Sequence, residues 1–302
     1  MSSNLKSSAL HGFAKSTAYD QHRPSYPAKS VQELLMQCRV AGVQGAKVLD
    51  LAAGTGKFTE LLAAREEGYE ILAIEPHDGM REVLEGKGMK GVKVEDGDAE
   101  NLPFEDESVD AIIAAQAFHW FATPQTLKSL HRVLRPHGAL GLIWNIEHYN
   151  EAHSHVAASS WESKLHDLIW SFEDNEPRFR HEKWRTVFDE QIKSTPLSLL
   201  FAADPLFALP LGEEREEWVV WLLKEKVWER FATLSQIAGL EGEELATSKR
   251  TKKAFDDAVN APDVEVNEKG EVAVHGTTYV VWTTKVPADG RPDLTGVERP
   301  IA

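Results

Sequence analysis

The chain has 302 residues, of which 48 are acidic and 33 are basic, so its net charge near neutral pH is −15. A charge of this sign opposes the long-range attraction that nucleic-acid-binding proteins use, and the sequence therefore disfavours a nucleic-acid partner. Apolar side chains make up 42% of the chain, but no apolar run approaches the ~20 residues that span a bilayer, so we expect no membrane partner.

Cysteine usage and the first residues indicate a reducing compartment. Cys38 is the single cysteine and has no partner for an intramolecular disulfide. Residues 1–8 lack the apolar core of a signal peptide. The expected location is cytoplasmic.

An aromatic loop precedes the first predicted helix. Residues 19–27 read Tyr-Asp-Gln-His-Arg-Pro-Ser-Tyr-Pro, and the pattern after them predicts a helix over 28–39. The loop can be an ordered turn without a functional role, or it can form a lid over a ligand. We predict that residues 1–44 form an N-terminal lid and helix.

A glycine turn follows the first predicted strand. Residues 47–56 read Lys-Val-Leu-Asp-Leu-Ala-Ala-Gly-Thr-Gly, and Glu75 ends a second predicted strand one βα unit later. Glycines let backbone N–H groups approach a ligand, and an acidic side chain accepts hydrogen bonds from ribose hydroxyls. The pattern predicts a site for a nucleotide-type cofactor.

The spacing of these glycines disfavours a dinucleotide. The G-x-G-x-x-G spacing that seats a pyrophosphate is absent, and Asp50 stands where it would repel phosphate. A negative charge at this place favours a ligand with a positive amino group. A nicotinamide-dependent oxidoreductase is therefore the weaker alternative.

Short apolar runs alternate with helix-length segments through the first half of the chain. The runs lie at 46–51, 69–75, 92–95, 109–115 and 139–145. Such alternation predicts parallel strands joined by helical crossovers. In one crossover Thr123 can cap a helix that has Pro124 at its first position. We predict an α/β core over residues 45–150.

The second half of the chain has a different pattern. Charged and Trp-rich segments predict helices over 152–173 and 212–259, with a core strand near 197–209, so residues 151–275 are expected to form a helical cap. An alternating run within 276–287 predicts a final core strand, and residues 288–302 predict a mobile tail. His148, His153 and His155 lack a closed ligand set, so we expect no metal.

Four motifs, in order, resemble those of the class I S-adenosylmethionine-dependent methyltransferases. They are Asp50 to Gly56, Glu75-Pro76 with Met80, Gly97 to Glu100 followed by Leu102-Pro103-Phe104, and Leu134 to Gly138. The resemblance implies a Rossmann-like seven-stranded sheet, mostly parallel, with helices on both faces and an antiparallel last strand at the sheet edge. It implies S-adenosyl-L-methionine as the cofactor and S-adenosyl-L-homocysteine as its product. Ala52 departs from the family, which usually carries glycine there.

The same resemblance implies a set of cofactor-binding residues. They are Asp50, Ala52, Gly54, Thr55, Gly56, Glu75, Pro76, Met80, Asp98, Ala99, Glu100 and Gln116. The loop at 19–27 is similar to the lid of a small-molecule subgroup that includes trans-aconitate methyltransferase. By that similarity Tyr19 and Arg23 contact the methionine end of the cofactor, where a guanidinium suits its carboxylate.

Polar and aromatic residues follow the fourth and fifth predicted strands, where ligands bind in open α/β sheets. His119 is the candidate catalytic residue, because an imidazole of ordinary pKa can accept a proton near neutrality. The alternative is that this segment only seats the next helix and caps the strands. The candidate substrate residues are Tyr26, His119, Trp120, Trp144, Asn145 and Tyr149.

The predicted function is transfer of a methyl group from S-adenosylmethionine to a small molecule, at a carboxylate, hydroxyl, thiol or carbon. A carboxylate or thiolate needs no general base, whereas a hydroxyl or carbon acid does. One alternative is a cofactor-binding protein without methyl transfer, and another is a macromolecular methyltransferase, which would require an open groove. No heptad pattern forces assembly, so we expect a monomer or a weak homodimer.

Overall fold

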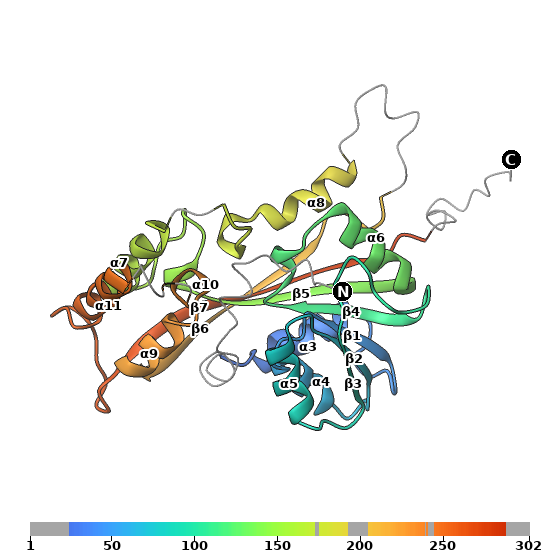
Figure 1. The fold of residues 1–302 in the computed structure, drawn as a ribbon, viewed down its shortest axis with the longest axis horizontal. Helices are drawn as coiled ribbons and strands as arrows, with labels where there is room; N and C mark the ends of the chain where they lie inside the picture. Colours follow the sequence, from blue (N-terminus) through green and yellow to red (C-terminus); the bar gives the residue numbers. More distant parts are fainter. Residues whose placement is uncertain (1–23, 173–174, 193–204, 239, 241–244, 288–302) are drawn as a thin grey trace, which may run out of the picture.

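A seven-stranded sheet runs through the molecule (Figure 1). The computed structural model describes residues 24–172, 175–192, 205–238, 240 and 245–287. The strand order is β3-β2-β1-β4-β5-β7-β6. The strands are β1 (Lys47–Leu51), β2 (Glu70–Ile74), β3 (Val92–Glu95), β4 (Val109–Ala115), β5 (Leu134–Glu147), β6 (Gly212–Leu223) and β7 (Glu271–Thr284).

The pairing confirms the predicted sheet and corrects the place of its last strand. Strands β3, β2, β1, β4 and β5 are parallel to one another, while β7 is antiparallel to both β5 and β6. The last strand was predicted at the edge of the sheet. It lies instead between β5 and β6, because β6 supplies an additional strand outside it.

Strand β6 contradicts the predicted helix over 212–259. Residues 212–223 pair with β7 along their whole length, and alternate side chains are half-buried and exposed. The glutamates at the start favour a helix, but the run Trp218-Val-Val-Trp221 suits a strand, and pairing with a neighbour decides between them. Helices begin only at residue 224.

Alternate side chains of the central strands face two apolar layers. Val48 packs with α3 (Ala28–Gln37) and α4 (Lys57–Ala63), whereas Leu49 packs with α6 (Pro124–Val133) and α8 (Thr186–Asp189) on the other face. The predicted Thr123 cap is confirmed, since its hydroxyl accepts a hydrogen bond from the backbone N–H of Thr126. Helix α5 (Asp78–Gly86) packs beside β3.

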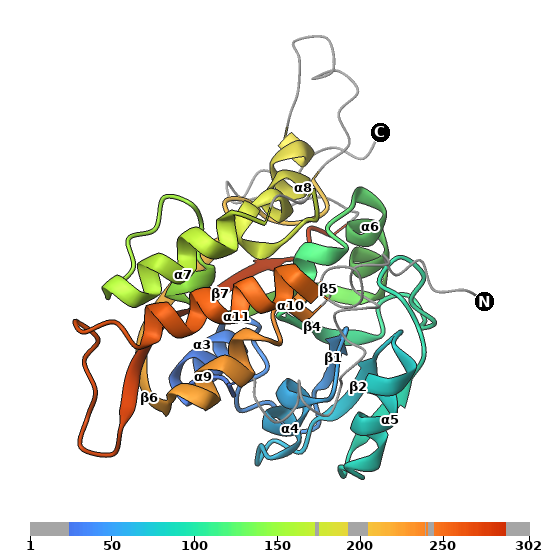
Figure 2. The same ribbon diagram turned by 60° about the vertical axis from the view of Figure 1, so that its left-hand side comes forward.

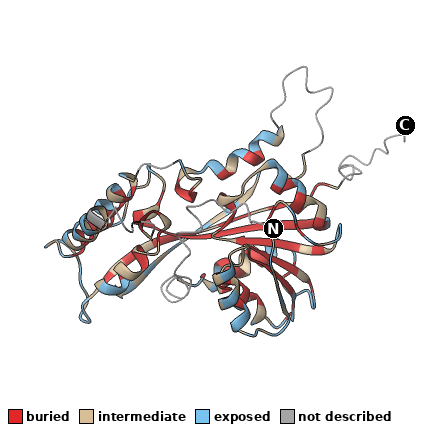
Figure 3. Ribbon diagram, in the orientation of Figure 1, coloured by how far each residue is buried: buried red, intermediate tan, exposed pale blue. Residues whose placement is uncertain are grey.

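The remaining helices gather at one end of the sheet, over the long ends of β5, β6 and β7 (Figure 2). They are α7 (Ser160–Trp170), α9 (Lys224–Phe231), α10 (Ser235–Ala238) and α11 (Leu245–Val259). Their apolar side chains form a separate core with Tyr149 and the first part of β7. Figure 3 shows the buried strands of the sheet and the exposed outer sides of these helices. We call α7, α9, α10 and α11 the cap.

The predicted strand near 197–209 falls mostly outside the described residues. Within the described part, Phe207 makes a single antiparallel bridge to Lys285. The tail from residue 288 also lies outside the described part. No helix among the described residues has the length and apolar character needed to cross a membrane.

Candidate active site

A cavity of about 900 Å³ lies at the carboxyl ends of β1, β2 and β4. Parallel strands bring these three loops to the same edge of the sheet, which is where open α/β sheets bind ligands. Its lining is Pro24, Tyr26, Ala52, Ala53, Gly54, Thr55, Lys57, Phe58, Glu75, Pro76, Met80, Ala115, Gln116, Ala117, Trp120 and Phe121. We call it the cofactor cavity.

The glycine turn and Glu75 form one connected unit in this cavity. The backbone of Ala52, Gly54 and Gly56 is left-handed, with φ of 56°, 59° and 88°. The backbone N–H of Gly54 donates to Glu75 Oε2 at 2.7 Å, and that of His77 donates to Oε1 at 2.8 Å. Both carboxylate oxygens are therefore fixed by the backbone of two consecutive βα loops.

Two buried carboxyl groups give this site its charge. Burial raises the pKa of Asp50 to about 7, while the hydrogen bond from the Thr59 hydroxyl at 2.6 Å opposes the shift. Burial also raises the pKa of Glu75 to about 7. Asp50 Oδ1 is buried and accepts no hydrogen bond from the described residues. A cationic ligand nearby would favour the ionised form of both groups.

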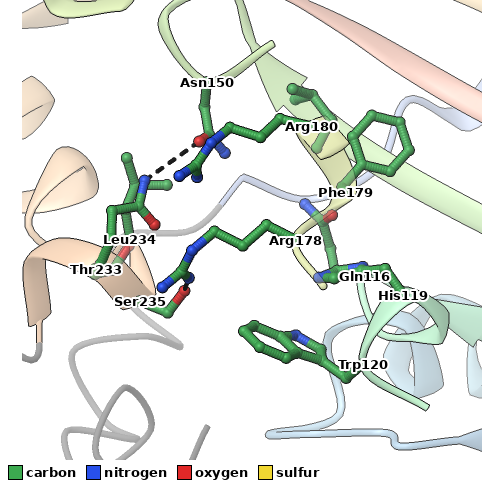
Figure 4. A pocket seen from close by; sticks show the side chains of 12 residues that line it. Gln116, His119, Trp120, Asn150, Arg178, Phe179, Arg180, Thr233, Leu234 and Ser235 are labelled. Carbon is green, nitrogen blue, oxygen red and sulfur yellow. Dashed lines mark hydrogen bonds between the residues drawn. The ribbon is translucent and has the colours of Figure 1, made fainter. Parts of the chain in front are cut away.

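A second cavity, of about 580 Å³, adjoins the first and shares Gln116 and Trp120 with it. Figure 4 shows its side chains, which come from the loop after β4, the end of β5 and the turn that follows it, the segment before α8, and the residues around the start of α10. They are Gln116, His119, Trp120, Ile146, Asn150, Arg178, Phe179, Arg180, Thr233, Leu234, Ser235 and Gln236. We call it the acceptor cavity.

Two buried arginines line the acceptor cavity. Arg178 is 7% exposed and Arg180 is 3% exposed. The Arg178 guanidinium donates to the Ser235 hydroxyl and lies 5.7 Å from the centre of the Trp120 ring. Arg180 lies 5.2 Å from the centre of the Trp170 ring, and Figure 4 shows both side chains extending across the cavity.

A hydrogen bond from Trp144 fixes the His119 ring. The indole Nε1 of Trp144 donates to Nδ1 of His119 at 3.1 Å, and both side chains are buried. Burial, with the positive charge of Arg178 as the next cause, lowers the pKa of His119 to about 3. The ring is therefore neutral at physiological pH.

Comparison with known proteins agrees with this geometry. A family model described as a methyltransferase domain matches residues 49–142. A methyltransferase-like protein of Schizosaccharomyces pombe is 34% identical over 170 residues, which are 56% of this chain and 62% of that protein. An uncharacterized methyltransferase of Mycobacterium bovis is 41% identical over 128 residues, or 42% of this chain and 49% of its own. The chain thus spans less than two thirds of the length of these relatives.

Solved structures match the fold over more of the chain. A protein of Anaeromyxobacter dehalogenans with a type II methyltransferase assignment superposes with a TM-score of 0.55 and 19% identity. The match covers 86% of this chain and 97% of that one. Residues 49–142 are a class I methyltransferase domain. This assignment confirms the family that the four motifs indicate.

Most predicted cofactor residues of the methyltransferase domain lie together. Seven of them line the cofactor cavity: Ala52, Gly54, Thr55, Glu75, Pro76, Met80 and Gln116. Asp50 is fully buried in β1, just before the turn, and Gly56 precedes the first turn of α4. Tyr19 and Arg23 lie outside the described residues. The next residues of the predicted lid do reach the cavity, where the Tyr26 ring packs edge-on to Phe58 at 5.4 Å.

The motif at 97–100 does not line the cofactor cavity. Asp98 Oδ1 accepts hydrogen bonds from the backbone N–H of Glu100 and Asn101, and so closes a local turn. Glu100 Oε1 accepts from the Thr123 hydroxyl at 2.8 Å, and Ala99 is buried beside the sheet. The cofactor role of Asp98, Ala99 and Glu100 stays a prediction.

The predicted substrate residues fall into two groups. His119 and Trp120 line the acceptor cavity, and Trp120 and Tyr26 line the cofactor cavity. Trp144, Asn145 and Tyr149 lie behind these walls. Asn145 donates to the Ser25 carbonyl at 3.0 Å and accepts from Thr278 at 2.6 Å, and Tyr149 packs in the core of the cap.

Sequence analysis missed the arginines of the acceptor cavity. Arg178 and Arg180 flank an aromatic residue in a short segment that carries no family motif. The usable signal is Arg-Phe-Arg itself, since two cations beside a buried aromatic ring are unusual in a surface loop. Lys57, Phe58 and Phe121 of the cofactor cavity were also missed, although each is close to a recognised motif.

The histidines after β5 form an aromatic cluster. His148 lies 4.4 Å from His155 and 5.7 Å from His275 between ring centres, while His153 contacts Trp170. Across the described residues, no group of three or more His, Cys, Asp or Glu side chains is arranged to hold a metal ion.

Proposed function

We propose that this chain transfers the methyl group of S-adenosylmethionine to a small-molecule acceptor. The observation that carries the proposal is the shared wall of the two cavities. Gln116 and Trp120 border both the cavity that contains the glycine turn and the polar cavity beside it. A ligand bound in one cavity would meet a ligand bound in the other at this wall, as a transfer between two substrates requires.

The cofactor cavity has groups suited to S-adenosylmethionine. The buried Oδ1 of Asp50, which has no donor among the described residues, favours a cation, and the Glu75 carboxylate suits ribose hydroxyls. Apolar side chains such as Met80 and Phe121 suit a flat base. When bound, S-adenosylmethionine supplies a methyl group that its sulfonium makes electrophilic. The protein then has to orient the acceptor and exclude water.

The acceptor cavity favours a small molecule over a macromolecule. The cap contributes Thr233, Leu234 and Ser235 to its wall, so the cavity is bounded by side chains from both halves of the chain. The net charge of −15 also argues against a nucleic-acid acceptor. We place the activity in the cytoplasm, in a monomer or a weak dimer, as the single cysteine and the absence of heptads lead us to expect.

Isothermal titration calorimetry with S-adenosylmethionine, S-adenosylhomocysteine and NAD tests the cofactor. We expect the first two to bind and NAD not to bind; binding of NAD alone, or of none of them, would overturn the proposal. Uptake of labelled methyl by panels of small acids, thiols and phenols then tests transfer. Cofactor binding without uptake by any of these acceptors would favour a binding protein without methyl transfer.

A further inference from the structure

Gln116 has an unusual backbone at the place where the two cavities meet. It directly follows β4 and borders both cavities. Its φ of 60° is left-handed, a conformation that residues other than glycine rarely adopt. Backbone strain of this kind persists only where the surrounding structure holds it, and it is concentrated at functional sites. The contacts that hold Gln116 therefore bear on the chemistry of this wall.

Two carbonyls of β5 hold Gln116 in this conformation. Its backbone N–H donates to the Ile143 carbonyl at 2.8 Å, and its side-chain Nε2 donates to the Asn145 carbonyl at 2.6 Å. A carbonyl can only accept, so the nitrogen of the Gln116 amide, and not its oxygen, faces Asn145. Asn145 is only 2% exposed, and its side chain is bonded to Thr278 and to the Ser25 carbonyl. A buried network thus fixes the orientation of the Gln116 amide.

This orientation leaves the amide oxygen, Oε1, for a ligand. Oε1 of Gln116 accepts no hydrogen bond from the described residues. Because the residue borders both cavities, a group bound at the shared wall is within reach of this oxygen. An amide oxygen is a hydrogen-bond acceptor only, so its partner on a ligand must be an N–H or an O–H group.

Other groups of the acceptor cavity are less suited to accept this hydrogen bond. Asn150 Oδ1 accepts from Gln236 Nε2 at 3.4 Å, and the Ser235 hydroxyl accepts from an arginine. The neutral His119 ring takes the Trp144 N–H on Nδ1, so Nε2 carries the proton and donates. Gln236 lines the acceptor cavity alone. Gln116 therefore has the amide oxygen that lies at the shared wall.

We propose that the acceptor carries an N–H or O–H group beside its reacting atom, and that Oε1 of Gln116 accepts a hydrogen bond from this group. The inference rests on the proposed methyl transfer, and it adds an acceptor role to the predicted cofactor role of Gln116. The donor keeps its proton. The hydrogen bond therefore orients the acceptor and takes no part in the making or breaking of bonds.

Pairs of ligands of similar size test the preference for a donor. The protein saturated with S-adenosylhomocysteine is titrated with phenol and aniline, each compared with fluorobenzene, and with benzamide compared with acetophenone. We expect at least one donor-bearing ligand to bind about three- to tenfold more tightly than its partner, as for a neutral hydrogen bond. Equal or weaker binding of every donor-bearing ligand would overturn the inference.

Glutamine variants test where the donor is recognised. Gln116→Met keeps the length of the side chain but removes the amide, so it should abolish the preference. Gln236→Met removes an amide of the same cavity away from the shared wall, and as the matched control it should keep the preference. A preference that survives in Gln116→Met, or that is lost only in Gln236→Met, would overturn the assignment.

Glycine and alanine at position 116 test the strained backbone without any ligand. Both substitutions remove the amide, but only glycine adopts a φ of 60° without steric cost. Gln116→Gly should therefore unfold at a higher urea concentration than Gln116→Ala, the reverse of their usual order in helices and strands. A lower midpoint for Gln116→Gly would contradict the strain from which the assignment starts.

Uptake of labelled methyl separates this inference from the proposed function. The donor preference is measured with S-adenosylhomocysteine bound, so it requires no turnover. We expect transfer to acceptors that carry a donor, with a higher KM in Gln116→Met. Transfer to donor-free acceptors alone would overturn the inference and support the proposed function. Failure of transfer to every acceptor, with the preference intact, would count against the proposed function and leave the hydrogen bond to Gln116 in place.

Discussion

The two cavities differ in how their walls are assembled from the sequence. The cofactor cavity is lined mainly by residues 52–58, 75–80 and 115–121, in the loops after three neighbouring parallel strands. The acceptor cavity combines residues 116–120 with 146–150, 178–180 and 233–236. A site made of consecutive βα loops leaves local motifs, whereas a site completed by a cap depends on contacts between distant segments. The first site could be predicted from the sequence, whereas only the part of the second that follows β4 could be.

The variant with the largest expected effect on stability tests whether the cap is energetically separate from the cofactor cavity. Phe231 is fully buried in the core of the cap, against Tyr149 and Phe255. Phe231→Ala should lower the free energy of unfolding by about 3–5 kcal/mol, because it leaves a cavity. Urea denaturation measures this loss. Calorimetry under folded conditions should show S-adenosylhomocysteine affinity within about twofold of the native value.

The control for this variant is Val219→Ala, since Val219 is 52% exposed on β6. We expect it to change stability by no more than about 0.5 kcal/mol. A loss of cofactor affinity in Phe231→Ala that matches the loss of stability would show that the two regions are not independent.

Variants of His119 test the acceptor cavity. His119→Ala should lower kcat/KM by about tenfold, the usual effect of losing one hydrogen bond, with little change in cofactor affinity. His119→Gln, which keeps an N–H donor, should recover part of the rate. Because the pKa of His119 is lowered to about 3, His119 should add no limb near pH 6.5 to native turnover measured at saturating S-adenosylmethionine.

A limb near pH 6.5 that disappears in His119→Gln would instead identify His119 as a base. Full turnover of His119→Ala at every pH would show that His119 has only a structural role.

A variant of Glu75 tests the cofactor cavity alone. Glu75→Ala should weaken S-adenosylmethionine binding by about 1–3 kcal/mol, since a charge-assisted hydrogen bond is lost. The pKa of Glu75 is raised to about 7 by burial, so the carboxylate is present above pH 7 and protonated below it. A ligand that needs the carboxylate should therefore bind more weakly as the pH falls below 7, and calorimetry at several pH values measures this.

The matched control is Glu70→Ala, an exposed carboxylate at the start of the same strand. It should leave both the affinity and its pH dependence unchanged. Native affinity in Glu75→Ala would remove Glu75 from the ribose site.

Ala52 is the position with the smallest expected effect. Its φ of 56° is left-handed, a conformation that costs an alanine about 1 kcal/mol more than a glycine. Ala52→Gly should therefore raise the free energy of unfolding by about 0.5–1 kcal/mol in urea denaturation. Ala53→Gly, at a neighbouring residue outside the left-handed region, is the control and should not stabilise the protein. A lower free energy of unfolding in Ala52→Gly would show that the left-handed backbone of Ala52 is not strained.

The sequence was sufficient for the elements that carry local signals. Apolar runs located β1 to β4 within a residue or two at each end, and the Thr123 cap located the start of α6. Strand β6 was misread because Glu213 to Glu217 favour a helix locally, and only the partner strand β7 overrides them. The arginines at 178 and 180 acquire a role only when the cap meets the sheet, and no spacing along the chain encodes that meeting.

The position of β7 determines when the sheet can be completed during synthesis. Among the strands that the structure describes, β7 is the last to be made, yet it lies between two strands that precede it in the chain. On the ribosome, β1 to β5 can pair as they emerge, but β6 has no place in the sheet until residues 271–284 have been translated. Until then the edges of β5 and β6 remain open to other chains. The acceptor cavity depends on the segment that follows β6, because Thr233, Leu234 and Ser235 line it, whereas the cofactor cavity is lined by residues that precede β5.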